Sequence, residues 1–286
     1  MRRRGVERGC AVLRDPTESY AQRLLITALG DYEHLVPEPI PSASLVRMMD
    51  EFDLSEDSTR TALSRLVRRD FLERFSAGRR TAYRLSELGT RLVAEGRARL
   101  LEFGTHRAWD GTWTLVAFSV SETRRSSRHV IHTHLRAQGF APFYDGVWIS
   151  AHASPAEVRD RLAEVEHADV TTFEGRLFDA TEVLAEKLHQ MWKLDGIRQA
   201  YTEFIAAFSS VADRVAGDQV SPAEAFVTRT RLMDAWRSFP RLDPEIPETM
   251  LPEGWPRSEA YRLFTTVYEE LRPTAELRFL SFVTTP

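Results

Sequence analysis

The chain has 286 residues, a net charge of −4 and a composition that is 43% hydrophobic and 28% charged, which excludes large-scale disorder and suits a globular protein of two or three domains. Its one cysteine, Cys10, excludes an intrachain disulfide and a multi-cysteine metal site, and fits a reducing compartment. No segment reaches the roughly 20 apolar residues of a membrane span and no signal-peptide core follows the basic start, so we expect a cytoplasmic protein without membrane contact.

Apolar residues at helical spacing predict three short helices near the N-terminus, at 17–29, at 42–52 and from Ser55 onward. The prolines between the first two helices force a loop there. Two short strands, FLERF and AYRLS, follow around an Ala-Gly-Arg-Arg turn, and a long helix comes after them. Three helices followed by a basic hairpin are the order of a winged helix-turn-helix, which we expect over residues 17–106.

The middle of the chain has a different order of elements. A buried strand at 113–120 leads into a basic helix, two strands joined by a tight turn, a helix capped by Ser154, and a last strand. This βαββαβ order predicts a ferredoxin-like domain over residues 107–178. Residues 179–286 show helical periodicity interrupted by a proline-rich stretch. The expected fold class is therefore α+β: an N-terminal winged helix-turn-helix, a central ferredoxin-like domain and a C-terminal mainly helical domain.

Positive charge is concentrated in residues 55–84, which hold eight arginines and four acids. That segment carries +4 and the rest of the chain −8, and a local basic face is what contact with DNA phosphates requires. On a helical wheel of the third helix, Thr59, Leu63, Leu66 and Val67 fall on one side, which we expect to pack into the domain. The opposite side carries short hydroxyl side chains and arginines.

This polar side of the third helix predicts a reading surface for double-stranded DNA. Short side chains let a helix enter a major groove about 12 Å wide, and arginine can bond the edge of guanine with two hydrogen bonds. Flanking arginines and the hairpin tip are better placed for phosphates. The alternative is a polar helical hairpin that contacts nothing. The candidate DNA contacts are Ser58, Arg60, Thr61, Ser64, Arg65, Arg68, Arg79 and Arg80.

Three long stretches of the chain also follow one another in a distinctive order. The first is STRTALSRLVRRDFLERFSAGRRTAYRLSELG from Ser58, the second begins WTLVAFSVSETRRSS at Trp113, and the third begins AFVTRTRLMDAWRSF at Ala225. In this order they resemble the reading head, the middle segment and the carboxy-terminal signature of the PaaX-like family, the phenylacetic acid catabolism repressors. The resemblance extends from about Tyr20 to Leu271, and three stretches in sequence are specific where one would not be.

The resemblance implies a dimeric repressor that leaves its operator when an acyl-CoA thioester binds. We expect a homodimer on a palindromic operator, with two reading helices in successive major grooves. The family's middle domain resembles ferredoxin-like CRISPR spacer-acquisition nucleases, which place a metal-binding aspartate at the end of the first strand. Here residues 119–122 contain no aspartate. We therefore expect no enzyme activity, no metal and no other cofactor.

The chain departs from the family pattern at three positions. Ser121 stands where the family usually has proline, and Asp70 and Arg257 stand where it usually has glycine. An acid at position 70, beside the reading helix, opposes phosphate, and we expect it to change the turn before the hairpin.

Aromatic and basic residues of the last domain suggest an effector site there. Large aromatic side chains can line an acyl pocket, although most are simply core, and arginines can neutralise the phosphates of coenzyme A. Arg229 and Arg231 lie two residues apart and therefore cannot both face one groove. Arg237 can pair with an acid of the protein instead of binding an effector. The candidate effector residues are Arg231, Trp236 and Arg237.

Three histidines, His129, His132 and His134, lie on the predicted basic helix of the middle domain. The first two are three residues apart, so they share a helix face and can bind zinc or another divalent ion. The arginines around them repel a cation, which favours a helix that is solvated or contacts an anion.

Two other functions stay open from the sequence. The middle domain can be a metal-dependent nuclease, in which case changing Glu122 abolishes cleavage. The chain can also be a small-molecule sensor that acts through a protein partner, in which case Arg65→Ala keeps full regulation. No phosphate-binding P-loop, zinc-protease or serine-hydrolase motif is present.

Overall fold

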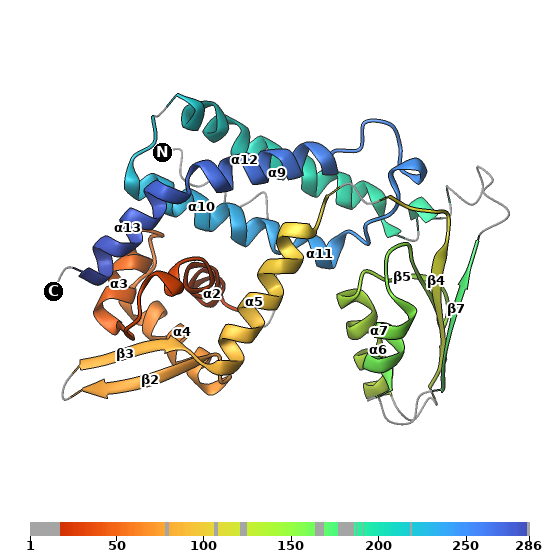
Figure 1. The fold of residues 1–286 in the computed structure, drawn as a ribbon, viewed down its shortest axis with the longest axis horizontal. Helices are drawn as coiled ribbons and strands as arrows, with labels where there is room; N and C mark the ends of the chain where they lie inside the picture. The colour runs from red at the N-terminus through yellow and green to blue at the C-terminus, as the bar shows by residue number, and fades with distance from the viewer. Residues whose placement is uncertain are drawn as a thin grey trace. The chain divides into compact units, whose positions relative to one another are not determined.

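The computed structural model (Figure 1) divides into two compact units, each built from segments that are distant in the sequence. The first unit consists of Met1–Glu102, Glu203–Ser238 and Glu259–Pro286, and the second of Phe103–Thr202 and Phe239–Ser258. The residues that the structure describes are 18–77, 80–105, 108–120, 125–163, 169–176, 186, 188–190, 192–217 and 219–284. The predicted domain limits at 106 and 178 stay a prediction, because a compact unit and an independently folding domain need not coincide.

Helices and a small antiparallel sheet form the N-terminal part of the first unit. The elements are α2 (Tyr20–Tyr32), η2 (Glu33–Leu35), β1 (Ile40–Pro41), α3 (Ser42–Asp50), α4 (Glu56–Arg68), β2 (Leu72–Ala77), β3 (Arg80–Leu85) and α5 (Glu87–Glu102). Ser19 caps α2 by accepting a hydrogen bond from the backbone N–H of Gln22, whose side chain accepts from Ser19 in return. Ser55 accepts the N–H of Ser58 at the start of α4. The three predicted helices and the hairpin are confirmed.

The hairpin gains a third strand that the sequence pattern did not predict. β3 pairs antiparallel with β2 and also with β1, where Ile40 lies opposite Tyr83 and Pro41 opposite Ala82. A strand of two residues has no alternation to detect, and the neighbouring prolines indicated only a loop. Pro41 is tolerated because β1 lies at the edge of this sheet.

Helices from the C-terminal third of the chain complete the core of the first unit. They are α10 (Pro222–Trp236) and α13 (Arg272–Thr284), with most of α9 (Leu194–Ala216) and α12 (Arg257–Glu270), which both begin in the second unit. α10 packs against α2 and α13, and α13 also packs against α3 (Figure 1). The ring of Tyr32 in α2 lies 5.3 Å from Phe226 and 5.2 Å from Phe279, centroid to centroid. The N-terminal helices therefore bury their apolar sides against the far end of the sequence.

The second unit contains a four-stranded antiparallel sheet with two helices on one face (Figure 1). Its elements are β4 (Trp113–Ser119), α6 (Arg125–Ala137), β5 (Ala141–Tyr144), β6 (Val147–Ser150), α7 (Pro155–Leu162) and β7 (Asp169–Gly175). The strand order is β5-β6-β4-β7, and Val116 and Trp148 of the sheet pack against Ile131, Leu135 and Val158 of the helices. A βαββαβ unit with this order is ferredoxin-like, as predicted.

A buried ion pair fixes the proline-rich segment of the second unit, which holds α11 (Phe239–Leu242) and η4 (Glu248–Met250). Both carboxylate oxygens of Asp243 accept hydrogen bonds from Arg257, at 2.8 and 2.9 Å, and the hydroxyl of Tyr201 donates to the same carboxylate at 2.7 Å. Arg257 also donates to the carbonyl oxygen of Ile246. Glycine at position 257 would leave the buried Asp243 without this counter-charge, so the departure from the family pattern has a structural role here.

Gly89, in the first turn of α5, is expected to tolerate no side chain. A Cβ atom there would lie 2.2 Å from the carbonyl oxygen of Phe71, which is far inside van der Waals contact. That oxygen belongs to the backbone and accepts the N–H of Ser86, so it cannot move aside cheaply. We expect Gly89→Ala to lower the free energy of unfolding by roughly 1–3 kcal/mol, measured by urea denaturation.

The matched control is Gly96→Ala, in the same helix. A Cβ atom at Gly96 meets nothing within 4 Å. Because alanine favours helix over glycine, this change should leave the stability unaltered or raise it by up to about 1 kcal/mol. Equal losses for both variants would contradict the close approach of α5 to Phe71.

Candidate nucleic-acid interface

The outward side of α4 is polar along its whole length. Thr59, Leu63 and Leu66 are at most 1% exposed, and Val67 is half-buried. The orientation predicted for this helix from the wheel is therefore confirmed. The exposed residues of α4 include the predicted contacts Ser58, Arg60, Thr61, Ser64, Arg65 and Arg68.

The arginines of α4 differ in how far they are engaged within the protein. Arg60 donates to Glu56, one turn earlier, at 2.7 Å. Arg65 and Arg68 make no ion pair with any described residue. The hydroxyl of Ser58 accepts a hydrogen bond from Ser55 at 3.0 Å but stays exposed. Arg65 and Arg68 are thus the arginines of α4 most available for a ligand. The exposed short side chains of Ser58, Thr61 and Ser64 lie nearer the start of the helix.

The hairpin adds a second group of cations to the same part of the chain. Arg80 is exposed and lies at the tip, because Ala77 and Arg80 form the last pair of the β2–β3 register. Arg74 and Arg84 are exposed on the two strands, and the guanidinium of Arg84 lies 5.2 Å from the ring centre of Phe75. Arg79 lies outside the described residues.

Asp70 does not change the turn before the hairpin, contrary to expectation. It adopts the left-handed conformation, with φ of 56°, that a glycine would adopt at the end of a helix. Its N–H donates to the carbonyl of Val67 and the N–H of Phe71 donates to that of Leu66, which together form a Schellman motif. The carbonyl of Asp70 also accepts from the Ser86 hydroxyl. Asp70 therefore replaces glycine at a backbone cost of about 1 kcal/mol without altering the path of the chain.

Trp236, one of the predicted effector residues, is part of the core of the first unit. It is fully buried and stacks on Phe264 at 4.6 Å between centroids. Its indole N–H donates to the carbonyl oxygen of Leu100, at the end of α5, at 3.0 Å. Trp236 thus connects α10 to the helix that follows the hairpin.

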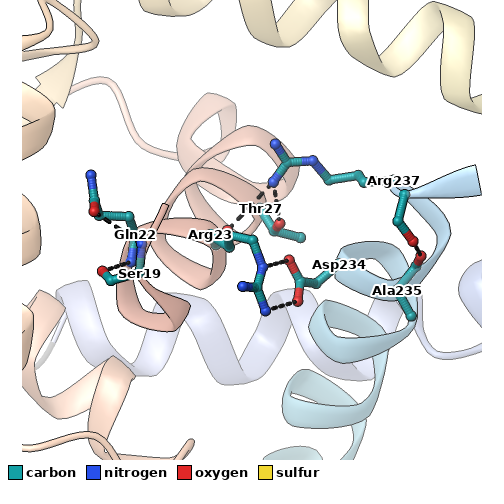
Figure 2. Close-up of polar contacts among 8 residues, drawn as sticks. Ser19, Gln22, Arg23, Thr27, Asp234, Ala235 and Arg237 are labelled. Atoms are coloured by element: carbon teal, nitrogen blue, oxygen red, sulfur yellow. Dashed lines mark hydrogen bonds and ion pairs between the residues drawn. The ribbon is translucent and has the colours of Figure 1, made fainter. Parts of the chain in front are cut away.

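The two predicted effector arginines also contact the N-terminal segment. Figure 2 shows Arg237 reaching α2, where its guanidinium donates to the hydroxyl of Thr27 at 2.8 Å. Beside it, Arg23 of α2 forms two hydrogen bonds with Asp234 of α10, each 3.3 Å long. The guanidinium of Arg231 lies 5.9 Å from the ring centre of Phe52. All three predicted residues therefore contact the N-terminal segment, at α5, at α2 and at Phe52 just after α3.

A buried polar cluster in the first unit was missed from the sequence. Arg229 of α10 is 1% exposed and donates to Asp31 of α2 at 3.2 Å, and the hydroxyl of Tyr268 in α12 donates to the other oxygen of Asp31 at 2.7 Å. Arg229 also donates to the carbonyl oxygen of Tyr268. Burial raises the pKa of the Asp31 carboxyl, while the charge of Arg229 opposes this shift. A charged residue within an apolar helical stretch was the only sequence signal for this cluster.

Removing the cation of this cluster should destabilise the protein strongly. Arg229→Met leaves Asp31 buried without its counter-charge, which typically costs about 3–5 kcal/mol. The measurement is the free energy of unfolding in urea.

The control for this variant is Arg214→Met, which breaks the ion pair of Arg214 with Glu224 at the start of α10. That pair is 42% and 35% exposed, so its loss should cost far less than the loss of the Arg229 pair. A similar loss of unfolding free energy for both variants would show that burial does not increase the contribution of the Arg229 pair to stability.

Little in the described ranges points to a metal or a membrane. No three histidine, cysteine, aspartate or glutamate residues gather there in a way that could hold an ion. Glu122, on which the nuclease alternative depends, lies outside the described residues. None of the helices within those ranges combines the length and apolar character needed to cross a membrane.

Three family models match the chain in succession and cover most of it. They are described as PaaX-like protein, PaaX protein central Cas2-like domain, and PaaX-like protein C-terminal domain, and they match residues 20–89, 106–187 and 192–281. The chain is also 29% identical over 243 residues to the transcriptional repressor PaaX of Escherichia coli (strain K12), a match that spans 83% of this chain and 76% of that protein.

A solved structure has the same fold. It is an uncharacterized protein from Mycobacterium tuberculosis, 22% identical, with a TM-score of 0.53 over 92% of this chain and 98% of that one. With its N-terminal, central and C-terminal segments each matched in the family's order, this chain belongs to the PaaX-like family.

Proposed function

We propose that the chain is a DNA-binding transcriptional repressor that reads its operator with α4. The observation that carries the proposal is the exposed polar side of α4, on which Arg65 and Arg68 have no ion-pair partner among the described residues. Membership of the PaaX-like family and the relative named as a transcriptional repressor support it.

In this proposal α2, α3, α4 and the β2–β3 hairpin form a winged helix-turn-helix, within a domain at residues 17–106. α4 packs against both α2 and α3, so its outward side is presented on a fixed support. Its short side chains allow it to enter the major groove, where Arg65 and Arg68 reach base edges. Arg60 and Arg80 would contact phosphates beside the groove.

Two such heads in a homodimer would bind the half-sites of a palindromic operator in successive major grooves. An acyl-CoA-type effector bound near Arg231, Trp236 and Arg237 would act on α2 and α5 directly, because these residues contact the N-terminal segment. The effector then favours an arrangement of the heads that no longer fits the operator, and operator and effector weaken each other's binding by the same factor. We place the protein in the cytoplasm, with domains at 107–178 and 179–286 completing the chain.

Arg65→Ala should weaken binding to the preferred duplex by about 1–3 kcal/mol, or roughly 5- to 150-fold, because it removes a base contact. The measurement is fluorescence anisotropy with a duplex selected from a random pool by the wild-type chain. Discrimination between this duplex and a mixed-sequence duplex should fall with it.

Arg80→Ala is the comparison, since a phosphate contact carries no sequence information. It should weaken binding to the selected and the mixed-sequence duplex equally. It should also lower the slope of log K against log salt by about 1. If Arg65→Ala also weakened binding to both duplexes equally, α4 would not be the base-reading helix.

The effector proposal predicts that an acyl-CoA thioester releases the selected duplex and that its free acid does not. Thermal-shift measurements across several thioesters and acids would identify the acyl group, and anisotropy would then measure release. Some thioesters will bind the protein and raise its melting temperature. If none of these thioesters changed DNA binding, the ligand would not regulate the protein in this way, which would count against this mechanism.

A further inference from the structure

Helix α6 of the second unit is basic and carries no acid. Its 13 residues, Arg125–Ala137, include three arginines and three histidines but no aspartate or glutamate. The neighbouring helix α7 mixes both signs, with Glu157 and Asp160 beside Arg159. The chain as a whole is negative, so a helix that carries basic residues and no acid is unusual in it.

The two arginines of α6 whose exposure is described lie on one side of the helix. Ile131 and Leu135 are fully buried against the sheet, whereas Arg128 and Arg136 are exposed. The two arginines are eight residues apart, which places them about 12 Å apart along the axis and about 80° apart around it. His132 lies between them on the same side. We refer to Arg128, His132 and Arg136 as the α6 stripe.

Contacts with β4 and β6 hold two members of the α6 stripe, His132 and Arg136, in place. The guanidinium of Arg136 lies 5.3 Å from the ring centre of Trp148, and the ring of His132 lies 4.9 Å from Trp148 and 5.7 Å from Phe118. Side chains that are already ordered lose less entropy when they bind.

The positive charge of the α6 stripe is barely compensated. Arg128 forms an ion pair with Asp145 at 3.4 Å, but the Asp145 side chain is 96% exposed, so the pair is weak. Arg136 has no acidic partner in the parts of the chain that the structure describes. Burial lowers the pKa of His132, and the charges of Arg136, Arg128 and His129 lower it further, while Asp145 opposes them. The local potential is therefore positive and favours an anion.

We propose that the α6 stripe is a second contact surface of this chain for the phosphate backbone of DNA. This inference rests on the proposed function, since it assumes that the chain binds duplex DNA. Arginines about 12 Å apart along a helix are poorly placed to share one phosphate, whereas DNA offers a continuous row of negative charges. Phosphate contacts carry no sequence information, so the α6 stripe adds affinity for DNA without adding specificity.

The test uses the full-length chain and a mixed-sequence duplex several helical turns long. Binding constants are measured over a series of salt concentrations for the wild type and for the double variant Arg128→Gln, Arg136→Gln. Each phosphate contact contributes about 0.9 to the slope of log K against log salt, so the double variant should lose about 2. Replacing both arginines with lysine should keep most of the slope.

The matched control is Arg159→Gln, which removes an exposed positive charge from α7 of the same unit. Its slope should equal that of the wild type. Histidine NMR on the wild-type chain gives an independent measurement, because phosphates near the α6 stripe should raise the pKa of His132 when the duplex is added.

Four outcomes decide the matter. The proposal is supported if the slope falls for the double variant and not for Arg159→Gln, and if duplex raises the pKa of His132. An unchanged slope while Arg65→Ala still weakens the selected duplex overturns the α6 contact and leaves the proposed function intact. An unchanged slope with loss of the dimer in sedimentation assigns the α6 stripe to a second copy of the chain and also overturns it. Absence of any DNA binding by the wild type overturns both proposals.

Discussion

The buried contact between Arg229, Asp31 and Tyr268 is the constraint on which the first unit depends. It ties α10 and α12, from the end of the chain, to α2, which supports α4. A charged pair of this kind is stable only while its geometry is kept, since separating the two charges inside the core would leave each unpaired. The helix proposed to read DNA is thereby connected through α2 to α10, which carries the residues proposed to contact the effector.

The support of α4 is equally specific at its far end. The left-handed Asp70 ends the helix, its carbonyl accepts from Ser86, and Ser86 caps α5 through the N–H of Gly89. The hairpin leaves and returns to this same point. Because Ser86, just after β3, donates to the carbonyl oxygens of Asp70 and Phe71, the base of the hairpin is fixed relative to α4, which a surface that contacts both a groove and its flanking phosphates requires.

The overall charge of −4 hides two local basic surfaces, one on α4 with the hairpin and one on α6. A negative net charge limits nonspecific attraction to nucleic acid, while local cations keep contact with phosphates possible. The two surfaces differ in chemistry. α4 offers short hydroxyls beside Arg65, suited to a groove, whereas the α6 stripe offers separated cations set against aromatic rings, suited to a backbone.

Local patterns in the sequence determined the helices, the hairpin, the outward side of α4 and the ferredoxin-like order of the second unit. These follow from periodicity, capping and connectivity, which act between residues close in the chain. Tertiary structure alone decided that α10 and α13 pack on α2 and α3, that Trp236 is core, and that Arg229 pairs with Asp31. Periodicity shows which side of a helix is buried but not what covers it, because that choice depends on packing between segments far apart in sequence.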